Sequence, residues 1–495
     1  MSASFRLLLN GTAVDVEGVP PRTTLLEWLR EHRLLTGSKE GCAEGDCGAC
    51  TVVVAERSGD RLAWKPINAC IRPLPSLAGK AVFTVESLKL DDGTLHPVQQ
   101  AMVDSHASQC GFCTPGFVMS LFGLYKNARD PSRAQIDDAI SGNLCRCTGY
   151  RPIIDAAKRM HGLTAPADWR GPSNASNADE TRLARRIAAL PSATLDYEVN
   201  GERWIAPDSE DALAAACAAH PDAVLVAGAT DVGLWITKQH RELPTMISTL
   251  AADDLARVER NDSHYVIGAG ASLADAFAAL DEDYPELHEA WVRFASVPIR
   301  HSGTLGGNIA NGSPIGDSMP ALIALGASLE LRRGDERREM PLEAFYLAYQ
   351  KTARRPGELV THVKVPRRPE ALILRAWKIS KRFDQDISAV FACFALHIED
   401  GRVTGARIGC GGVAPIPARA KQTEAALVGH AWNEQVASDA TAVLAAEFTP
   451  IDDMRASAVY RKTVLGNLVR RLWLETGGMH RAPSRIDDPR VSAAS

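Results

Sequence analysis

The sequence predicts a multidomain α+β protein, and three observations lead to this fold class. The chain has 495 residues, enough for roughly three or four domains of ordinary size. Eight of its eleven cysteines gather in two tight groups within the first third. Strand-like and helix-like patterns alternate over the rest of the chain. The net charge of −5 offers no basic field for nucleic acid or an anionic membrane.

The amino-terminal stretch, residues 1–18, lacks the long apolar core of a secretory signal. No run of about eighteen apolar residues predicts a membrane span. Clustered cysteines in a long chain without a signal peptide are typical of metal ligation in a reducing compartment, not of a disulfide framework. We therefore expect a cytoplasmic protein with no membrane and no nucleic-acid partner.

Residues 1–90 predict a small ferredoxin-like unit built around the sequence GCAEGDCGAC. Cys42, Cys47 and Cys50 lie within nine residues, and Cys70 follows. This is the spacing of plant-type [2Fe–2S] ligation. The intervening glycines allow a tight loop whose backbone N–H groups face the sulfur atoms. A zinc site is the main alternative, although zinc pairs usually come as two C-x-x-C knuckles. Strands are expected at residues 5–9, 14–16, 51–55 and 82–85, and a helix at residues 24–32.

Residues 91–163 predict a helical unit that carries the second cysteine group. Cys110 and Cys113 form QCGFCTPG, and Cys145 and Cys147 form NLCRCTGYRP. Each pair precedes a predicted helix, whose N-terminal dipole and free N–H groups favour thiolates. A second [2Fe–2S] cluster fits this spacing. A four-cysteine zinc site and a redox disulfide remain alternatives, but the disulfide lacks its usual βαβ context. Four helices are expected, at residues 96–103, 115–125, 133–141 and 152–161.

Residues 164–195 are rich in Pro, Ser, Asn and Asp and predict a linker, with a short helix possible at residues 180–190. The linker separates the cysteine-containing units from a third unit of different composition. We expect this third unit to span residues 196–375.

Two stretches of the third unit suit a phosphate-bearing ligand. The sequence AVLVAGATDVGL is a buried strand that runs into a Gly-containing turn with Thr230 and Asp231, although many strand-to-helix turns look the same. The sequence SGTLGGNIANGSPIGD predicts a loop with almost no bulky side chains. There Thr304, Asn308, Ser313 and Asp317 can supply directional hydrogen bonds. The G-x-G at residues 268–270 lacks the third glycine of a dinucleotide fingerprint, so we interpret it as a structural turn.

Residues 376–484 predict a last α+β unit. Apolar and polar residues alternate over residues 376–396 and 403–420, as in antiparallel strands. Helices are expected at residues 433–446 and 453–474, and residues 485–495 predict a polar tail.

The paired cysteine motifs resemble the iron–sulfur portion of the molybdenum hydroxylases, the family of xanthine dehydrogenase and aldehyde oxidase. The resemblance implies that one cysteine group binds the cluster proximal to the molybdenum cofactor and the other binds the distal cluster near the flavin. The implied proximal ligands are Cys110, Cys113, Cys145 and Cys147, and the implied distal ligands are Cys42, Cys47, Cys50 and Cys70.

The sequences AGATDVG and GTLGGNIANGSPIGD resemble the two FAD-binding segments of the same family. This implies a two-subdomain flavin domain of the vanillyl-alcohol-oxidase type, followed by the family's C-terminal α+β domain. The implied FAD contacts are Ala227, Gly228, Ala229 and Thr230 with Thr304, Gly307, Asn308 and Asn311 around the pyrophosphate loop, Asp317 at the sugar-like part, and Phe294 near the isoalloxazine. Lys378, Lys381, Arg382 and Asp384 are candidates for shaping the nicotinamide approach, or form a solvated strand edge.

The resemblance implies the small, electron-transfer subunit of a split xanthine dehydrogenase. Electrons from xanthine or hypoxanthine hydroxylation at a separate molybdenum subunit would pass through two [2Fe–2S] clusters to FAD and then NAD⁺. It also implies a heterotetramer with two copies of each chain. We expect no catalytic acid or base in this chain. The sequence leaves O₂ open as the acceptor, and it leaves two other functions open: a standalone iron–sulfur flavoprotein NADH reductase and a non-enzymatic scaffold stapled by zinc.

Overall fold

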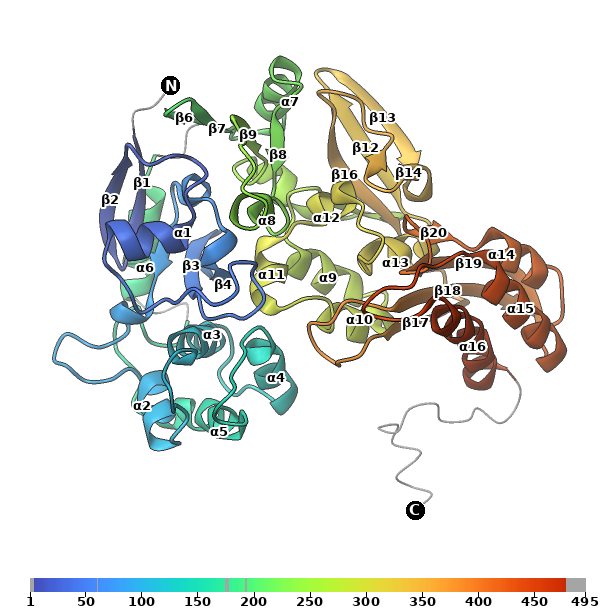
Figure 1. The fold of residues 1–495 in the computed structure, drawn as a ribbon, viewed down its shortest axis with the longest axis horizontal. Coiled ribbons are helices and arrows are strands. Elements are labelled where there is room, and N and C mark those ends of the chain that lie inside the picture. Colours follow the sequence, from blue (N-terminus) through green and yellow to red (C-terminus); the bar gives the residue numbers. More distant parts are fainter. Residues whose placement is uncertain (1–3, 60, 174–177, 192–193, 478–495) are drawn as a thin grey trace. The chain divides into compact units, whose positions relative to one another are not determined.

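The structure is a computed structural model that describes residues 4–59, 61–173, 178–191 and 194–477. The polypeptide forms two compact units (Figure 1). The first contains the described residues up to Ala256 together with Ser272–Ala274 and Ala295–Thr304. The second contains Arg257–Ala271, Asp275–Phe294 and the described residues from Leu305 onward. The tail expected at residues 485–495 lies outside the described residues.

The first unit begins with a five-stranded sheet in the order β2-β1-β5-β3-β4. β1 pairs antiparallel with β2 and parallel with β5. Thr24 caps the following short helix through its hydroxyl group, which accepts from the Glu27 N–H. This mixed sheet with one main helix confirms the ferredoxin-like prediction. The elements are β1 (Ser4–Leu9), β2 (Thr12–Glu17), α1 (Leu25–Glu27), the π-helix η1 (Trp28–His32), β3 (Thr51–Ser58), β4 (Arg61–Asn68), η2 (Ala69–Ile71), η3 (Leu74–Leu77), β5 (Ala81–Phe83) and η4 (Val85–Ser87).

A helical part follows, and all four predicted helices are present. Their starts are marked by side chains suited to helix N-termini: His96 and Ser132 form capping boxes, and Pro115 lies in the first turn of its helix. The helices are α2 (Pro97–Asp104), α3 (Thr114–Asn127), α4 (Arg133–Ser141) and α5 (Arg151–Arg159), followed by η5 (Met160–Gly162).

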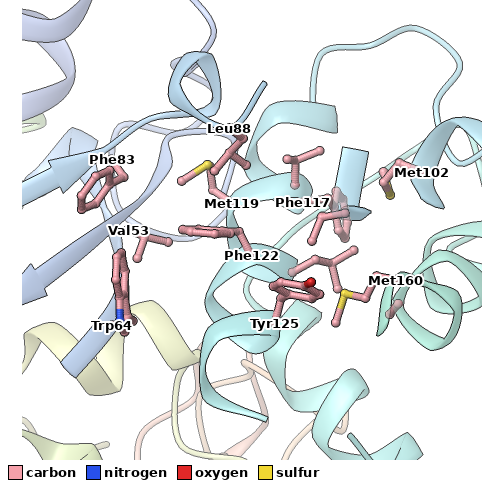
Figure 2. Packing of buried hydrophobic residues seen from close by; sticks show 14 of the residues in the cluster. Val53, Trp64, Phe83, Leu88, Met102, Phe117, Met119, Phe122, Tyr125 and Met160 are labelled. Carbon is pink, nitrogen blue, oxygen red and sulfur yellow. The ribbon is translucent and has the colours of Figure 1, made fainter. Parts of the chain in front are cut away.

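The sheet and the helical part share one hydrophobic core (Figure 2). Trp64 and Phe83 of the sheet pack with ring centroids 5.3 Å apart, and Phe122 of α3 meets Trp64 edge-on at 6.0 Å. The segment predicted as a linker contains α6 (Ala178–Ala188), and its Leu183 and Ile187 are buried in the same core. The two cysteine-containing parts are therefore fixed to each other by packing.

A buried lysine reinforces this core. Lys126 Nζ of α3 lies 4.1 Å from the centroid of the Trp64 ring and donates to the carbonyl groups of Trp169 and Gly171 at 2.8 and 2.7 Å. Glu180 of α6 supplies its counter-charge at 3.3 Å. The helix α6 and the segment before it are thus held to the helical part by charge as well as by apolar contact.

A second sheet in the first unit has the order β6-β7-β9-β8, with β7, β9 and β8 parallel. It shares a core with the ferredoxin-like sheet: Tyr197 meets Phe5 edge-on at 5.2 Å, and its hydroxyl group donates to the Val19 carbonyl at 2.7 Å. The elements are β6 (Leu195–Val199), β7 (Glu202–Ala206), α7 (Glu210–Ala219), β8 (Val224–Val226), α8 (Val232–Thr237), β9 (Thr245–Ser248), η6 (Asp253–Ala256) and α11 (Val297–Ser302).

The second unit contains an antiparallel sheet in the order β10-β11-β16-β12-β13. The loop predicted over residues 302–317 is wrong in part, because Leu305–Asn311 forms α12. Gly306 explains this: a Cβ there would lie 2.3 Å from Ala269 Cβ, so the glycine lets the helix pack directly on its neighbour. The elements are β10 (Val258–Arg260), β11 (His264–Gly268), α9 (Leu273–Asp281), η7 (Pro285–Leu287), α10 (His288–Val292), α12 (Leu305–Asn311), α13 (Ser318–Leu325), β12 (Ser328–Arg333), β13 (Glu336–Pro341), η8 (Leu342–Ala344), β14 (Tyr346–Ala348), β15 (Lys351–Thr352) and β16 (Leu359–Pro366).

The second unit ends in an antiparallel sheet, β17-β18-β19-β20, covered by three helices. The predicted strands and the two long helices are present, whereas α14 was not predicted. Among the described residues, no helix combines the length and apolar character needed to cross a bilayer. The elements are β17 (Leu372–Ile379), β18 (Val390–Glu399), β19 (Arg402–Gly411), β20 (Ala418–Arg419), α14 (Lys421–Leu427), α15 (Glu434–Glu447) and α16 (Ala458–Thr476).

Candidate cofactor sites

The first cysteine group comes together at the end of the ferredoxin-like sheet. Cys42, Cys47 and Cys50 lie on the loop between η1 and β3, and Cys70 lies on η2. The thiols of Cys47 and Cys70 hydrogen-bond to Cys42, and Cys70 also hydrogen-bonds to Cys50. The backbone N–H groups of Asp46 and Cys47 donate to Cys42 Sγ at 3.3 Å. Four sulfur atoms with backbone donors around them are the donor set of a [2Fe–2S] cluster.

These contacts perturb the acidity of the thiols. Hydrogen bonds from Cys47 and Cys70 hold the pKa of Cys42 well below the usual thiol range, and a hydrogen bond from Cys70 lowers the pKa of Cys50 despite burial. The same hydrogen bonds, together with burial, raise the pKa values of Cys47 and Cys70. A bound cluster would hold all four sulfurs as thiolates, so its binding would release the protons that these thiols share.

The second cysteine group forms two pairs, one between Cys110 and Cys147 and the other between Cys113 and Cys145. Cys113 is the N-cap of α3, and burial raises the pKa of its thiol to about 12. Against the effect of burial, hydrogen bonds from Thr148 and from the backbone lower the pKa of Cys145. The Thr148 hydroxyl group lies 3.2 Å from Cys145 Sγ. Each pair joins one thiol of C-x-x-C to one of C-x-C, so the two motifs bring four thiols together, the number that a [2Fe–2S] cluster needs.

Nowhere in the described ranges do three or more His, Cys, Asp or Glu side chains form a group that could hold a metal ion. A [2Fe–2S] cluster spreads its four thiolates over two irons, so its ligands do not surround a single point. The two groups also differ in exposure. Cys110 and Cys147 are exposed, whereas Cys50 and Cys70 are buried.

The two cysteine sites are in direct backbone contact. The Leu144 N–H donates to the Cys47 carbonyl at 3.0 Å, and Asn143 Nδ2 donates to the Gly48 carbonyl at 3.1 Å. Asn143 is held in turn by the Ser120 hydroxyl group, which donates to its Oδ1 at 2.7 Å. Gly116 of α3 lies under this junction, where a Cβ would be 2.2 Å from the Gly48 carbonyl oxygen. The loops that carry Cys47 and Cys145 therefore form one continuous structure.

Part of the predicted flavin site lies in the first unit. Ala227, Gly228, Ala229 and Thr230 form the turn between β8 and α8, and Thr304 follows α11. Ala229 has a φ of 60°, and a Cβ at Gly228 would lie 1.8 Å from the Ser302 carbonyl oxygen, so the turn packs tightly on the end of α11.

This turn belongs to the same core as the first cysteine group. Ala229, Cys50 and Cys70 are all buried in it. Thr237 at the end of α8 donates through its hydroxyl group to the Ala43 carbonyl at 2.7 Å. The candidate flavin turn and the cluster loop are therefore held together within one unit.

The second unit contains the remaining predicted flavin residues. Asp317 is buried, and its two oxygens accept from Lys378 Nζ and from the Ser388 hydroxyl group, both at 2.6 Å. Asn308 bonds the Ser318 hydroxyl group beside it. Carboxylate oxygens keep further acceptor positions, so Asp317 retains capacity for a ligand. Gly307 lies on α12, Asn311 is exposed at the end of α12, and Phe294 meets Phe277 edge-on at 5.8 Å.

The other charged candidates divide between core and surface. Lys378 is buried with Asp317, whereas the surface residues Lys381 and Arg382 contact the Met454 carbonyl and Asp386. Arg293, which the sequence analysis did not select, lies 4.5 Å from the centroid of the Phe383 ring. Asp384 acts electrostatically on Arg293.

Three buried residues beside the sites were missed from the sequence. Asn143 and Ser120 connect the two cysteine loops, and Arg72 follows Cys70 by two positions and contacts the Gly228 carbonyl. In the sequence, the only signal for a role at these sites was position: Arg72 lies two residues after Cys70, and Asn143 lies in the GNLCRC stretch beside Cys145.

Four family models match consecutive parts of the chain and together cover most of it. A 2Fe-2S iron-sulfur cluster binding domain matches residues 7–74, and a [2Fe-2S] binding domain matches residues 84–158. An FAD binding domain in molybdopterin dehydrogenase matches residues 197–368. A CO dehydrogenase flavoprotein C-terminal domain matches residues 375–476.

Whole proteins give the same result. Xanthine dehydrogenase of Emericella nidulans is 32% identical over 88% of this chain and 36% of its own length. Carbon monoxide dehydrogenase of Hydrogenophaga pseudoflava has a chain that matches with a TM-score of 0.52 and 26% identity, over 54% of this chain and 94% of that one. Reconstituted CO dehydrogenase of Oligotropha carboxidovorans matches with a TM-score of 0.51 and 28% identity, over the same shares.

This chain spans little more than a third of the length of the curated relatives it matches. Within that span, the order of the four matched models is the order of the folded parts described above. The chain carries two [2Fe–2S]-binding domains, an FAD-binding domain and a flavoprotein C-terminal domain, and these four domains match the iron–sulfur and FAD part of the molybdenum hydroxylases.

Proposed function

We propose that this chain is the electron-transfer subunit of a cytoplasmic, NAD⁺-dependent xanthine dehydrogenase. The observation that carries this proposal is the continuity of three sites in the first unit: the two cysteine groups and the turn at residues 227–230. When bound, the clusters and FAD supply the one-electron and two-electron redox chemistry. The protein holds, spaces and shields these groups.

The eight cysteines are proposed as the cluster ligands, with Cys110, Cys113, Cys145 and Cys147 on the proximal side. Cys110 and Cys147 are exposed, and the adjacent Phe112 and Leu144 keep 48% and 39% of their surface accessible. Thiol ligands that are exposed, on loops that also expose apolar side chains, are accessible to another protein surface. Electrons would therefore enter at this group.

The distal group is proposed as the relay to the flavin. Cys50 and Cys70 are buried, and their core includes Ala229 of the candidate pyrophosphate turn. Burial excludes water from this step and keeps the separation of the sites constant. No acid–base residue of this chain is assigned to the hydroxylation itself.

Flavin binding is proposed for the residues given by the family resemblance. In the first unit these are Ala227, Gly228, Ala229, Thr230 and Thr304; in the second they are Phe294, Gly307, Asn308, Asn311 and Asp317. NAD⁺ is proposed as the acceptor, with Lys381, Arg382 and Asp384 near its approach.

A separate molybdenum-cofactor subunit is proposed as the partner, in a heterotetramer with two copies of each chain. Two observations support a partner. This chain spans only 36% of the length of a xanthine dehydrogenase. In carbon monoxide dehydrogenase, one chain matches 54% of this chain over 94% of its own length. Xanthine is the first substrate to test, and CO is the second because of the structural matches.

The test is an affinity purification of this chain from its native host, with molybdenum, iron and flavin measured per chain. The proposal predicts a large co-purifying chain with molybdenum, about four irons and one flavin per copy of this chain. It also predicts xanthine-dependent reduction of NAD⁺. Isolation of the chain alone, with iron, flavin and NADH-driven dye reduction, would favour the standalone reductase. CO-dependent activity without xanthine activity would reassign the substrate.

A further inference from the structure

Arg72 is a buried cation between the distal cysteine group and the candidate flavin turn. It directly follows η2, which carries Cys70, and keeps only 6% of its surface accessible. Its Nη1 donates to the Gly228 carbonyl at 3.4 Å, the one hydrogen bond of its side chain to the described part of the chain. Its Nε is buried and has no partner there. The guanidinium group is therefore held in place but poorly satisfied.

No carboxylate among the described residues forms an ion pair with Arg72. Glu56 is the acidic group that acts on it electrostatically, but its oxygens bind Lys65 at 2.5 Å and Lys80 at 2.6 Å. Removing a charge from water without a partner is strongly unfavourable. A cation kept in such a place is expected to receive its anion from a ligand.

The turn that Arg72 contacts indicates which anion could pair with it. Gly228 lies in the turn that follows the parallel strand β8, where successive backbone N–H groups can face an anion. Gly303 packs next to Thr230 of this turn, since a Cβ at Gly303 would lie 3.5 Å from the Thr230 hydroxyl oxygen. The turn also lies inside the matched FAD-binding domain, residues 197–368. The pyrophosphate is the anionic part of FAD.

We propose that Arg72 is the counter-ion of the FAD pyrophosphate at the turn formed by residues 227–230. The inference rests on the proposed assignment of this turn to the pyrophosphate. It makes the iron–sulfur domain a direct contributor to flavin binding. Because Arg72 lies two residues after Cys70, the segment that holds the distal cluster also holds the flavin.

The proposal predicts two effects of opposite sign in Arg72→Met, which keeps the length of the side chain and removes its charge. Without flavin, the variant should be as stable as the wild type or more stable, because an unpaired buried charge has been removed. Its affinity for FAD should fall by about tenfold to hundredfold, the range expected when charge-assisted hydrogen bonds are lost. Its affinity for riboflavin, which has no phosphate, should not change.

The experiment uses the full chain with its iron in place and its flavin removed. Binding of FAD and of riboflavin is followed by quenching of flavin fluorescence, and unfolding of the flavin-free protein is followed by circular dichroism. Arg72→Lys keeps the charge and should retain part of the FAD preference. Arg22→Met is the matched control, because Arg22 is a partly exposed arginine paired with Glu202 at 2.9 Å.

A loss of FAD affinity without loss of riboflavin affinity or stability supports the proposal. Equal weakening of both flavins, or reduced stability of the flavin-free Arg72→Met protein, overturns it and leaves Arg72 as a structural support of the turn. Failure of the wild-type chain to bind FAD would instead contradict the proposed function.

Discussion

The Leu144 N–H donates a hydrogen bond to the Cys47 carbonyl at 3.0 Å. Leu144 immediately precedes Cys145, so a ligand of one proposed cluster is joined to a ligand of the other through backbone bonds and this one hydrogen bond. Asn143 and Ser120 hold the junction from the side, and both are buried. The junction fixes the separation of the two sites.

Replacing Asn143 with Leu tests this junction. The change removes one hydrogen bond to the Gly48 carbonyl, which keeps those from the Thr51 N–H and hydroxyl groups, and leaves the buried Ser120 hydroxyl group without its partner. We therefore expect the free energy of unfolding to fall by about 1–3 kcal/mol. The magnetic interaction between the two reduced clusters should also weaken, which electron paramagnetic resonance measures. Asn127→Ala is the control, because Asn127 also donates one hydrogen bond to a backbone carbonyl, that of Trp64, at 2.8 Å. An equal spectral change in both variants would contradict a specific role of Asn143.

Single cysteine substitutions test the assignment of the two groups. Cys70→Ser and Cys110→Ser should each lower the iron content from about four to about two per chain, and each should remove a different paramagnetic signal. The lost signal differs because each cysteine belongs to its own group. Cys410→Ser is the control, since Cys410 is a buried free thiol on β19, and it should keep all the iron. Loss of both signals in Cys110→Ser would contradict two independent sites.

His96 should make the first unit sensitive to mild acid. It is fully buried; its Nδ1 accepts from the Val98 N–H, and its Nε2 lies 3.0 Å from the Arg170 carbonyl. Burial lowers the pKa of His96 to about 4, below its ordinary value of 6.5. Between these values the unfolded chain binds a proton that the folded chain does not, so stability falls as the pH falls. We expect a loss of about 2 kcal/mol between pH 7 and pH 5 from this group.

Denaturant unfolding at the two pH values measures this loss. His96→Asn keeps a side chain suited to an N-cap but does not titrate, so its pH dependence should be smaller by about the same amount. An unchanged dependence would assign the acid sensitivity to other groups.

Asp317 and Lys378 allow structure and flavin binding to be separated. Their side chains are buried and joined at 2.6 Å. Asp317→Asn leaves the lysine charge uncompensated, so we expect a loss of about 3–5 kcal/mol in unfolding free energy, measured by calorimetry. The double variant Asp317→Leu, Lys378→Met should recover most of this stability. If the double variant also retains its flavin, the proposed contact between Asp317 and FAD is wrong.

Sequence patterns correctly predicted the elements whose structure depends on neighbouring residues in the chain. The helices α2 to α5 follow from capping residues and apolar spacing, and the cysteine groups follow from loop glycines and short gaps. In contrast, the stretch around Gly306 was predicted to be a loop because it has almost no bulky side chains. Its helix forms because the missing side chain permits close packing on Ala269, which is distant in sequence.

The residues that connect the sites could not be predicted for the same reason. Arg72 and Asn143 have no local signature, and each gains its position from a contact far along the chain, with Gly228 and Gly48 respectively. Similarly, the segment after residue 163 has the composition of a linker. Glu180 on α6 stabilises the fold only because Lys126 and Trp64, which are distant in sequence, pair with its carboxylate group.

The hydrophobic core shared by the ferredoxin-like sheet and the helical part determines the smallest fragment of this chain that can fold on its own as an electron carrier. A ferredoxin cut from the chain at residue 90 would carry Trp64, Phe83 and Val53 on an uncovered face, since their packing partners come from α3 and α6. Such a fragment would aggregate through that face before its cluster could be used. A portable electron carrier made from this chain must therefore extend through α6 and contain both clusters.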